Sequence, residues 1–370
     1  MMAGINGNNH IKYFRMKRAM RDTLTKWDDY QGEFHLANNK QNNNQMKKIL
    51  AIMLLAGTMF TCYPDYIKDF DYTSIYIPIQ LDVRTFVVGE GMKFNMGVEL
   101  GGVRENTRDR IVTYKVDNSL ITPAVLDKLK GGPAYISAAT ADVATLLPLP
   151  SNYYSLSNPT QFVIKNGDHT GIVTVKPDSA RFLADPATIT PVYAIGIRVL
   201  SADADSLLYD KKTAVIGVKF ENMLFGSYWH GGVTTVKDPT DANVISTLKY
   251  YTQIPVSEVK TWALKSVSPY AVSVNGYSDV SSSAAPEFIL SLSGSNVAIS
   301  SSTTGKYAIK QDGPSSYNQA KLLQNRRIFL SYKYLASDGN WYHAKDTLTF
   351  RNRIRDGVNE WMDENPANYK

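Results

Sequence analysis

Cysteine is almost absent from this sequence, and its scarcity limits the possible fold and chemistry. Cys62 is the only cysteine among 370 residues. A single cysteine excludes a framework of internal disulfides and a zinc site built on several thiolates. A long hydrophobic run is also missing, because the apolar stretch at residues 49–60 is too short to cross a bilayer core of about 30 Å as a helix. The composition, with 44% hydrophobic and 20% charged residues, is otherwise that of an ordinary globular protein.

An excess of positive charge is missing too, once the leading segment is set aside. The whole chain carries 40 Lys and Arg against 34 Asp and Glu. Nine of these basic residues and four of the acidic residues precede Cys62, which leaves 31 basic and 30 acidic residues from that point onward. A surface that binds nucleic acid or an anionic membrane needs clustered positive charge. With a net charge of +1, the body of the chain does not favour either partner.

A secretory leader lies inside the chain rather than at its start. Met46 and two lysines precede the apolar run of residues 49–60, and Cys62 follows that run. This order of basic, apolar and cleavage regions is typical of a signal peptide. The alternative is a buried helix, but the lysines before the run and the strand-like sequence after it favour a signal peptide at residues 46–61.

Cys62 stands at the point where a lipoprotein leader is cleaved. Residues 59–62 read Met-Phe-Thr-Cys, which resembles the bacterial lipobox, although phenylalanine is bulky for its position. We expect Cys62 to be the lipid attachment point, so that several acyl chains anchor the protein in the outer membrane at the cell surface. The alternative is ordinary cleavage near residues 56–58, which would give a periplasmic protein. A lone cysteine in an exported chain favours the lipoprotein.

Residues 1–45 do not resemble part of a mature exported protein. They are polar, rich in asparagine and low in complexity. A signal peptide must lie near the true start of a chain to be recognised. We therefore interpret this segment as a disordered extension from an upstream start codon chosen in error, with Met46 as the true initiator. The alternative is a cytoplasmic arm on a membrane-anchored protein.

Alternating hydrophobic residues after the leader predict β-strands. Every second residue from Ile75 to Leu81 is aliphatic, which places these side chains on one face of a strand. The asparagine–glycine turn at Gly167 predicts a hairpin between the strands on either side of it. Residues 192–200 and 213–220 form a further predicted strand pair.

The first half of the folded chain is predicted to be a β-sandwich. Short strands separated by polar turns are typical of that architecture. Only residues 122–130 and 177–185 have a helical pattern, and both segments are brief. We assign residues 62–222 to this domain.

The second half is predicted to be a small β-barrel. A boundary falls near residues 222–225, and strands follow one another from residue 226 without a long crossover. The final pair is a hairpin that turns at residues 337–340. An up-and-down succession of this kind closes into a barrel, so we assign residues 223–370 to the barrel and its C-terminal tail.

Several motifs also resemble known domains. The segments "DYTSIYIPIQLDVRTFVVGE", "ELGGVRENTRDRIVTYKVDNSLI" and "FVIKNGDHTGIVTVK" resemble the immunoglobulin-like domain of unknown function 1735, which is common in surface lipoproteins of gut-type Bacteroidota. The sequence from "FGSYWHGG" onward is similar to the lipocalin-like domain of unknown function 4361. The resemblance implies an all-β chain with an immunoglobulin-like β-sandwich followed by a lipocalin-like up-and-down barrel. It also implies an accessory protein of a polysaccharide-utilisation system, beside an outer-membrane glycan importer.

Catalytic motifs are absent from the sequence. It contains no zinc-binding His-Glu-x-x-His, no Gly-x-Ser-x-Gly elbow, no P-loop and no dinucleotide fingerprint. "HGG" at His230 faintly resembles a lipase oxyanion loop, but a bend in the first barrel strand explains these glycines more simply. Asp203, Asp205 and Asp210 lack the spacing of a calcium loop. We therefore expect no catalysis, no cofactor and no metal.

A carbohydrate-binding role calls for exposed aromatic rings beside hydrogen-bonding groups. Trp341 and Tyr342 follow a predicted turn directly and are the favoured ligand contacts. Tyr317 lies in a polar segment and is comparable, whereas Trp229 is more often a core residue at its position.

We predict non-catalytic capture of a polysaccharide or oligosaccharide at the cell surface. A structural or adhesive surface protein, such as an assembly subunit that contacts other proteins, is the alternative. An enzyme with an unrecognised site is a third reading. The only membrane contact expected is the lipid anchor.

Overall fold

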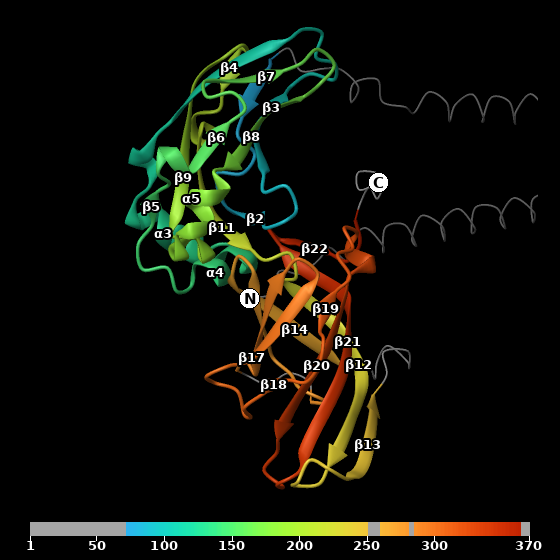
Figure 1. The fold of residues 1–370 in the computed structure, drawn as a ribbon. Coiled ribbons are helices and arrows are strands. Elements are labelled where there is room, and N and C mark those ends of the chain that lie inside the picture. Colours follow the sequence, from blue (N-terminus) through green and yellow to red (C-terminus); the bar gives the residue numbers. More distant parts are fainter. Residues whose placement is uncertain (1–71, 251–259, 281–284, 364–370) are drawn as a thin grey trace, which may run out of the picture. The chain divides into compact units, whose positions relative to one another are not determined.

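The structure of the protein is a computed structural model that describes residues 72–250, 260–280 and 285–363 (Figure 1). Strands dominate these residues, and the predicted all-β fold, a sandwich followed by a barrel, is confirmed. The expectations about residues 1–45, the leader and Cys62 lie outside the described residues. Among the described residues, no helix combines the length and the hydrophobicity needed to span a bilayer.

The sandwich consists of two sheets that face each other. The five-stranded sheet has, in spatial order, β10 (Ser206–Leu207), β1 (Ser74–Tyr76), β3 (Phe94–Gly101), β8 (Thr170–Pro177) and β6 (Tyr154–Leu156). The six-stranded sheet has β2 (Leu81–Val87), β11 (Thr213–Glu221), β9 (Tyr193–Ala202), β4 (Arg110–Val116) and β7 (Gln161–Ile164), with β5 (Leu147–Pro148) paired to β9.

The core of the sandwich lies between its two sheets. Buried and exposed residues alternate along β3, as the period of two along a strand requires. The side chains of Phe86, Val98, Tyr114 and Phe162 are fully or almost fully buried in this layer. The hydroxyl of Tyr114 donates a hydrogen bond of 2.5 Å to the carbonyl oxygen of Asn158, which satisfies the one polar atom of this ring.

The hairpin predicted at Gly167 is wrong. Strands do flank the turn, and Gly167 adopts the positive φ of 85° that favours glycine there. However, β7 pairs with β4 in one sheet, whereas β8 pairs with β3 and β6 in the other. The turn therefore connects the two layers, because a local turn signal does not specify the strand with which each arm will pair. The predicted pairing of residues 192–200 with 213–220 is confirmed as β9 with β11.

Three short helices interrupt the strands of the sandwich. The two predicted helices are confirmed as α3 (Pro123–Lys130) and α5 (Ser179–Ala184). Thr122 and Asp178 cap them, since each side chain accepts a hydrogen bond from a first-turn backbone amide. The helix α4 (Ala134–Thr140) was not predicted, and it has no such side-chain cap. Single 3-10 turns occur at Asn118–Leu120, Ser151–Tyr153, Pro186–Ile189, Tyr209–Lys211 and Leu323–Asn325.

The barrel is a meander that closes on itself. Its sheet runs through β12 (Gly226–Lys237), β14 (Thr261–Ser268), β15 (Ala271–Val274), β16 (Phe288–Ser293), β17 (Asn296–Ser301), β19 (Ser316–Tyr317), β20 (Arg327–Leu335) and β21 (Trp341–Arg355), and β21 pairs with β12. Three short additions are β13 (Val244–Tyr250), β18 (Lys310–Gln311) and β22 (Val358–Glu360). The hairpin predicted at residues 337–340 is confirmed, because it joins β20 to β21.

Alternation along β21 fixes which side chains face the barrel interior. Every second residue from Ala344 to Phe350 is buried, and the residues between them are partly or fully exposed. By the same period, Tyr342 belongs to the inner face of this strand, and Trp341 and His343 belong to its outer face. Two neighbouring aromatic residues are thereby directed to opposite sides of the sheet.

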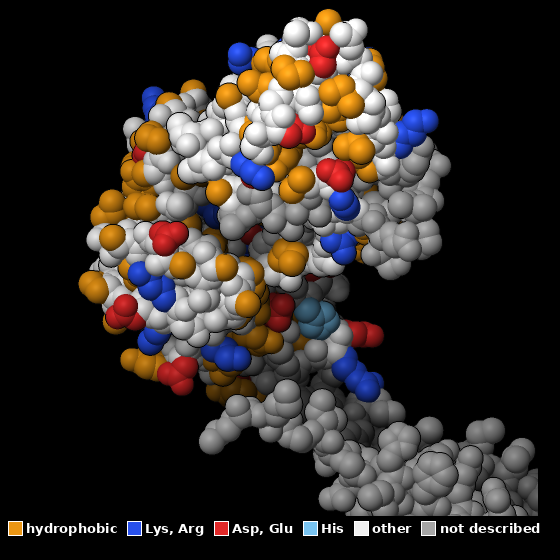
Figure 2. Space-filling model, turned by 90° about the horizontal axis from the view of Figure 1, so that it is seen from below, with side chains coloured by type: hydrophobic (Ala, Val, Ile, Leu, Met, Phe, Trp, Pro, Cys, Tyr) orange, Lys and Arg blue, Asp and Glu red, His pale blue; other side chains and the backbone are white. Residues whose placement is uncertain are grey.

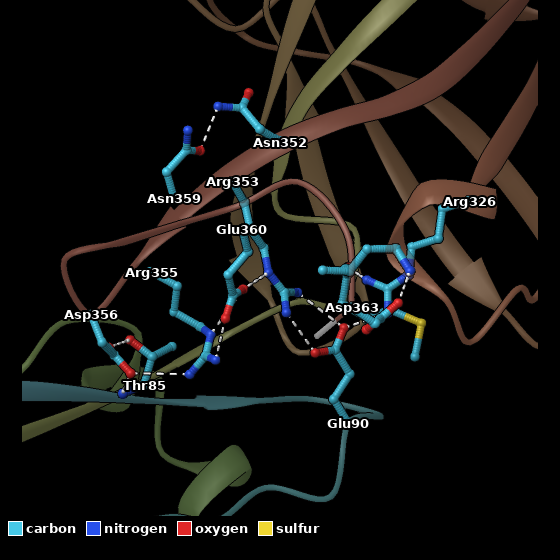
Figure 3. A network of polar contacts seen from close by, with 12 residues as sticks. Thr85, Glu90, Arg326, Asn352, Arg353, Arg355, Asp356, Asn359, Glu360 and Asp363 are labelled. Carbon is cyan, nitrogen blue, oxygen red and sulfur yellow. Dashed lines mark hydrogen bonds and ion pairs between the residues drawn. The ribbon is translucent and has the colours of Figure 1, made fainter. Parts of the chain in front are cut away.

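A network of arginines and carboxylates connects the loop after β2 with the barrel (Figure 3). Glu90 accepts hydrogen bonds from Arg326 at 2.5 Å and from Arg353 at 2.7 and 3.0 Å. Arg353 also donates to Glu360 at 2.5 Å. Both arginine side chains are almost completely buried, so their charges depend on these partners.

Candidate functional site

Trp341 lies on the outer face of the barrel, where β21 begins. It pairs with Lys237 of β12 on one side and with Leu335 of β20 on the other. Its ring is half-buried rather than enclosed. The ammonium groups of Lys333 and Lys310 lie 5.1 Å and 6.0 Å from the ring centroid. These distances are within the range of a cation–π contact.

His343, two residues further along the same face, is held between two carboxylates. Its Nδ1 lies 2.6 Å from Oδ2 of Asp312, and its Nε2 lies 2.5 Å from Oδ1 of Asp241. A ring nitrogen that carries a proton donates a hydrogen bond to a carboxylate, so the two acidic side chains fix the orientation of the imidazole ring. Lys333 completes the network with a hydrogen bond of 2.7 Å to the other oxygen of Asp241.

Asp241 reaches this network from the turn between β12 and β13. Asp238, at the start of the turn, accepts hydrogen bonds from the hydroxyl of Thr240 and from the side chain of Asn243, which lower the pKa of Asp238 to about 2. This turn presents Asp241 with a positive φ of 60°. Hydrogen bonds from Lys333 and His343 hold the pKa of Asp241 well below its ordinary value, so its carboxylate stays ionised.

We use the name Trp341 face for these six residues: Trp341, His343, Lys310, Lys333, Asp241 and Asp312. The face combines one flat aromatic ring with charged hydrogen-bonding groups on the same side of neighbouring strands. In the described part of the chain, no group of three or more histidine, cysteine or acidic side chains could hold a metal ion. In this face both nitrogens of His343 are already engaged by carboxylates.

Tyr342 does not share a surface with Trp341. Its ring stacks on Tyr334 at 5.2 Å, and Tyr334 stacks on Tyr307 at 4.9 Å, with interplanar angles of 16° and 15°. Tyr342 and Tyr334 lie on the inner face of β21 and β20, and Tyr307 reaches them from the loop between β17 and β18. Tyr334 therefore has a neighbour on each side of its ring, which leaves little room for a ligand to stack there.

The other two candidates lie elsewhere. Tyr317 in β19 is 5% exposed, and its hydroxyl donates a 3.0 Å hydrogen bond to the carbonyl oxygen of Ala320. Trp229 is half-buried on the outer face of β12, under the guanidinium of Arg351 at 4.7 Å. The core position next to it is taken by Tyr228, which is fully buried. The structure therefore does not bring Trp229 or Tyr317 together with Trp341.

A second polar cluster lies inside the barrel. The carboxylate of Asp346 accepts hydrogen bonds from Tyr250 at 2.5 Å and from Tyr332 at 2.6 Å. His230 stacks on the indole of Trp262 at 3.7 Å, and its Nε2 lies 3.3 Å from Asp346. Every member of this cluster except Tyr250 is buried, so the cluster stabilises the barrel interior rather than offering a surface.

Sequence reasoning found Trp341 but did not place Asp241, His343 and Lys333 beside it. The step of two residues from Trp341 to His343 in a predicted strand could have placed both on one face. No local signal could have found Asp241, which is 102 residues away from His343 in the sequence. On the face of the molecule shown in Figure 2, acidic and basic side chains are interspersed, without a large patch of one sign.

Comparisons with known proteins support the fold. Residues 70–206 match a family model described as "-like, N-terminal domain". A Bacteroides ovatus protein of unknown function has a similar solved structure, with 19% identity, a TM-score of 0.56, and coverage of 80% of this chain and 99% of its own. A multidomain protein including DUF1735, also from Bacteroides ovatus, is 11% identical and covers 79% of this chain and 100% of its own, but its TM-score of 0.39 is too low to carry an argument. No curated protein matches the chain. This chain therefore shares its fold with a Bacteroides protein of unknown function, and residues 70–206 match the family model.

Proposed function

We propose that this protein captures a polysaccharide or oligosaccharide, without catalysis, at the Trp341 face. The observation that carries the proposal is the half-buried ring of Trp341 beside the hydrogen-bonded network of Asp241, His343 and Asp312. The C–H patches of a sugar ring can lie against an indole, while its hydroxyls bond to neighbouring polar groups. Carboxylates and ammonium groups on one side of the sheet supply both acceptors and donors.

The lysines near the ring do not block this use. Lys333 and Lys310 are attached by flexible aliphatic stems, and an exposed cation–π contact contributes only about 0.5–1 kcal/mol. A sugar ring can therefore displace an ammonium group from the indole at small cost. The displaced groups stay close enough to bond to sugar hydroxyls.

The lowered pKa of Asp241 favours binding over hydrolysis at this face. A glycosidase needs one carboxylic acid that keeps its proton near neutral pH, which requires a raised pKa. Asp241 has a lowered pKa, because Lys333 and His343 donate to it. Asp241 is therefore not suited to act as the general acid.

We place this activity at the outer membrane. The support is the leader at residues 46–61 and Cys62 after it, which suit a lipid anchor. A surface-anchored glycan-binding protein would pass its ligand to an outer-membrane importer complex, which is the partner we propose. A periplasmic protein is the alternative location.

Affinity electrophoresis of the full chain with Cys62→Ala tests the proposal. Its migration would be measured in gels that contain a panel of soluble polysaccharides. We expect at least one polysaccharide to retard the parent protein. Trp341→Ala should weaken the affinity for that polysaccharide about tenfold, because losing the ring contact costs about 1.5 kcal/mol of binding free energy. Trp229→Ala is the matched control, because its half-buried ring lies under an arginine about 26 Å along the same strand pair.

The control should keep the retention of the parent protein. Equal retention of the parent protein and Trp341→Ala would contradict the assigned site. Absence of retention by every polysaccharide in the panel would contradict glycan capture itself.

A further inference from the structure

A large pocket lies where the loop after β2 meets the barrel. Residues 88–93 of this loop line it together with Leu183 of α5 and barrel residues that include Tyr270 and Leu292. We call it the loop pocket. Its volume is about 990 Å³, at the upper end of the range of about 300–1,000 Å³ for small-molecule sites. None of the six residues of the Trp341 face lines it, so this pocket is separate from the proposed glycan site.

Apolar side chains make up much of the lining of the loop pocket. Leu183, Met223 between β11 and β12, and Leu292 of β16 are each half-buried and line the pocket. The ring of Tyr270, in the turn between β14 and β15, is 62% exposed and lines the same pocket. An apolar ligand body that covers these side chains is favoured, because apolar surface is removed from water on both partners.

Two residues of the lining have an unusual backbone conformation. Met92 and Gln319 have φ angles of 41° and 53°, in the left-handed region that residues other than glycine seldom adopt. Ser179 of α5 holds Met92 in place, since its hydroxyl donates a hydrogen bond of 3.6 Å to the Met92 sulfur. Residues held in such conformations cluster at ligand sites and switch regions, which makes this pocket a candidate ligand site.

The charges that line the loop pocket are mostly positive. Its charged residues are Lys93, Lys321 and Arg326 against Glu90. Glu90 is already neutralised, because it accepts hydrogen bonds from Arg326 and Arg353 (Figure 3). Both lysines are exposed, and within the part of the chain that the structure describes their ammonium groups have no hydrogen-bond or ion-pair partner. The lining therefore offers two unpaired positive charges to a ligand.

We propose that the loop pocket binds a small carboxylate with an apolar body. The carboxylate pairs with the ammonium groups of Lys93 and Lys321, since charge-assisted hydrogen bonds of this kind are the strong ones. The apolar body lies against Tyr270, Met223 and Leu292. An acyl chain and an aromatic ring both supply such a body, and the probes of the experiment distinguish them. Glycan capture at the Trp341 face is not needed for this inference.

Two simpler occupants fit the lining less well. An inorganic anion would pair with the lysines but would leave the exposed ring of Tyr270 and the side chains of Met223 and Leu292 in water. A neutral apolar compound would cover these side chains but would form no ion pair with Lys93 or Lys321. A ligand with both parts uses the whole lining, as small-molecule sites combine an apolar surface with a few polar groups that fix orientation.

Isothermal titration calorimetry of the full chain with Cys62→Ala tests this pocket at neutral pH. The probes are octanoate, which has an acyl chain, and 2-naphthoate, which has an aromatic ring. We expect at least one of them to bind at a single site with a Kd on the order of 100 µM, as is typical of ligands of this size. The neutral counterparts, 1-octanol and 2-naphthol, should bind at least about fivefold more weakly, because they form no ion pair with the lysines.

Variants of the lining locate the binding site. Lys93→Gln combined with Lys321→Gln removes both charges and should weaken binding of the carboxylate about tenfold. Tyr270→Ala should weaken it too, because part of the apolar lining is lost. The matched control is Tyr209→Ala combined with Lys212→Gln. The ammonium group of Lys212 lies 4.1 Å from the ring centroid of Tyr209, and neither residue lines the pocket, so this control should bind as the parent does.

Three outcomes would overturn the inference. If neither acid binds at concentrations well above the expected Kd, the pocket does not take such a ligand. If the alcohols bind as tightly as the acids, the lysines do not recognise the charge. If the double lysine variant binds the acid as tightly as the parent, the acid occupies another place. Thermal melting of each variant shows whether the fold is kept, so loss of binding is not confused with unfolding.

Discussion

At the scale of single residues, the Trp341 face depends on groups that hold one another's charge. The ring nitrogens of His343 contact Asp241 and Asp312, and Lys333 places a positive charge beside Asp241. Exposed ion pairs contribute little singly, but a network of several charges fixes side-chain positions more firmly. A fixed arrangement beside Trp341 is what a weak carbohydrate contact needs.

The lowered pKa of Asp241 gives a prediction for acid. A carboxyl group whose pKa is lower in the folded state than in the unfolded state stabilises the fold at a pH above its unfolded pKa of about 3.9. This stabilisation is lost as the pH falls toward the folded pKa. We expect the melting temperature of Asp241→Asn to lie below that of the parent near pH 6 and to approach it near pH 2. Thermal melts across this range test the prediction, and a constant gap would contradict it.

Gly232 gives a second prediction at this scale. A β-carbon at this position would lie 2.4 Å from Oδ1 of Asp346 and 2.4 Å from the carbonyl oxygen of Lys345. The close approach of Asp346 and of the Lys345 carbonyl oxygen therefore explains why a glycine stands here. Gly232→Ala should cost about 1–3 kcal/mol of unfolding free energy in urea. If the midpoint and slope of urea unfolding are the same in Gly232→Ala and the parent, the β-carbon fits beside Asp346 without cost and the prediction is wrong.

At the scale of elements, Tyr250 fastens β13 to the rest of the barrel. Its hydroxyl reaches the buried carboxylate of Asp346, and burial together with this negative charge raises the pKa of Tyr250. Tyr250→Phe removes this hydrogen bond and leaves one acceptor of Asp346 unpaired, at a cost of about 1–3 kcal/mol.

Hydrogen exchange should therefore speed up in β13 of the Tyr250→Phe variant, while the amides of β20 keep their protection. Such a local effect is expected where few buried contacts hold a strand. Equal protection of β13 in the variant and the parent would show that the backbone pairing with β12 suffices to hold this strand.

The same scale shows what the sequence could and could not predict. Alternation and turn residues specified most of the strands, the all-β class, and the hairpin at residues 337–340, because these signals are local. The single strand predicted from Ile75 to Leu81 is wrong, since the chain leaves β1 after Tyr76 and enters β2 of the other sheet at Leu81. The residues of the turn at Gly167 predict a hairpin, but the two strands beside it enter different sheets. Trp341 was identified as a candidate, whereas the position of Asp241 beside His343 depends on the closure of the barrel and has no local signature.

At the scale of the whole folded region, Glu90 is the acceptor that two buried arginines share. Burial alone would raise the pKa of Glu90, but the hydrogen bond from Arg353 and the charge of Arg326 hold it below its ordinary value. This carboxylate therefore stabilises the fold above its unfolded pKa, and the contribution is lost as the pH falls through the folded pKa.

Glu90→Gln should be strongly destabilising. Removing this charge leaves Arg326 and Arg353 buried without their shared partner, and breaking a buried ion pair costs about 3–5 kcal/mol. Urea unfolding at neutral pH measures the effect. The control is Asp109→Asn, because the exposed pair of Asp109 with Lys165 should contribute little. A loss no larger than in that control would show that the arginines find other partners.

The most direct test of carbohydrate capture is a titration followed by the indole N–H signals in the NMR spectrum of the ¹⁵N-labelled full chain with Cys62→Ala. The ligands are oligosaccharides prepared from a polysaccharide that retards this protein in gels. The chain has five tryptophans, and the peak missing from Trp341→Phe assigns Trp341. We predict a saturable shift of the Trp341 peak, while the peak of the buried Trp262 stays in place. Saturable binding that leaves the Trp341 peak unmoved would contradict the account.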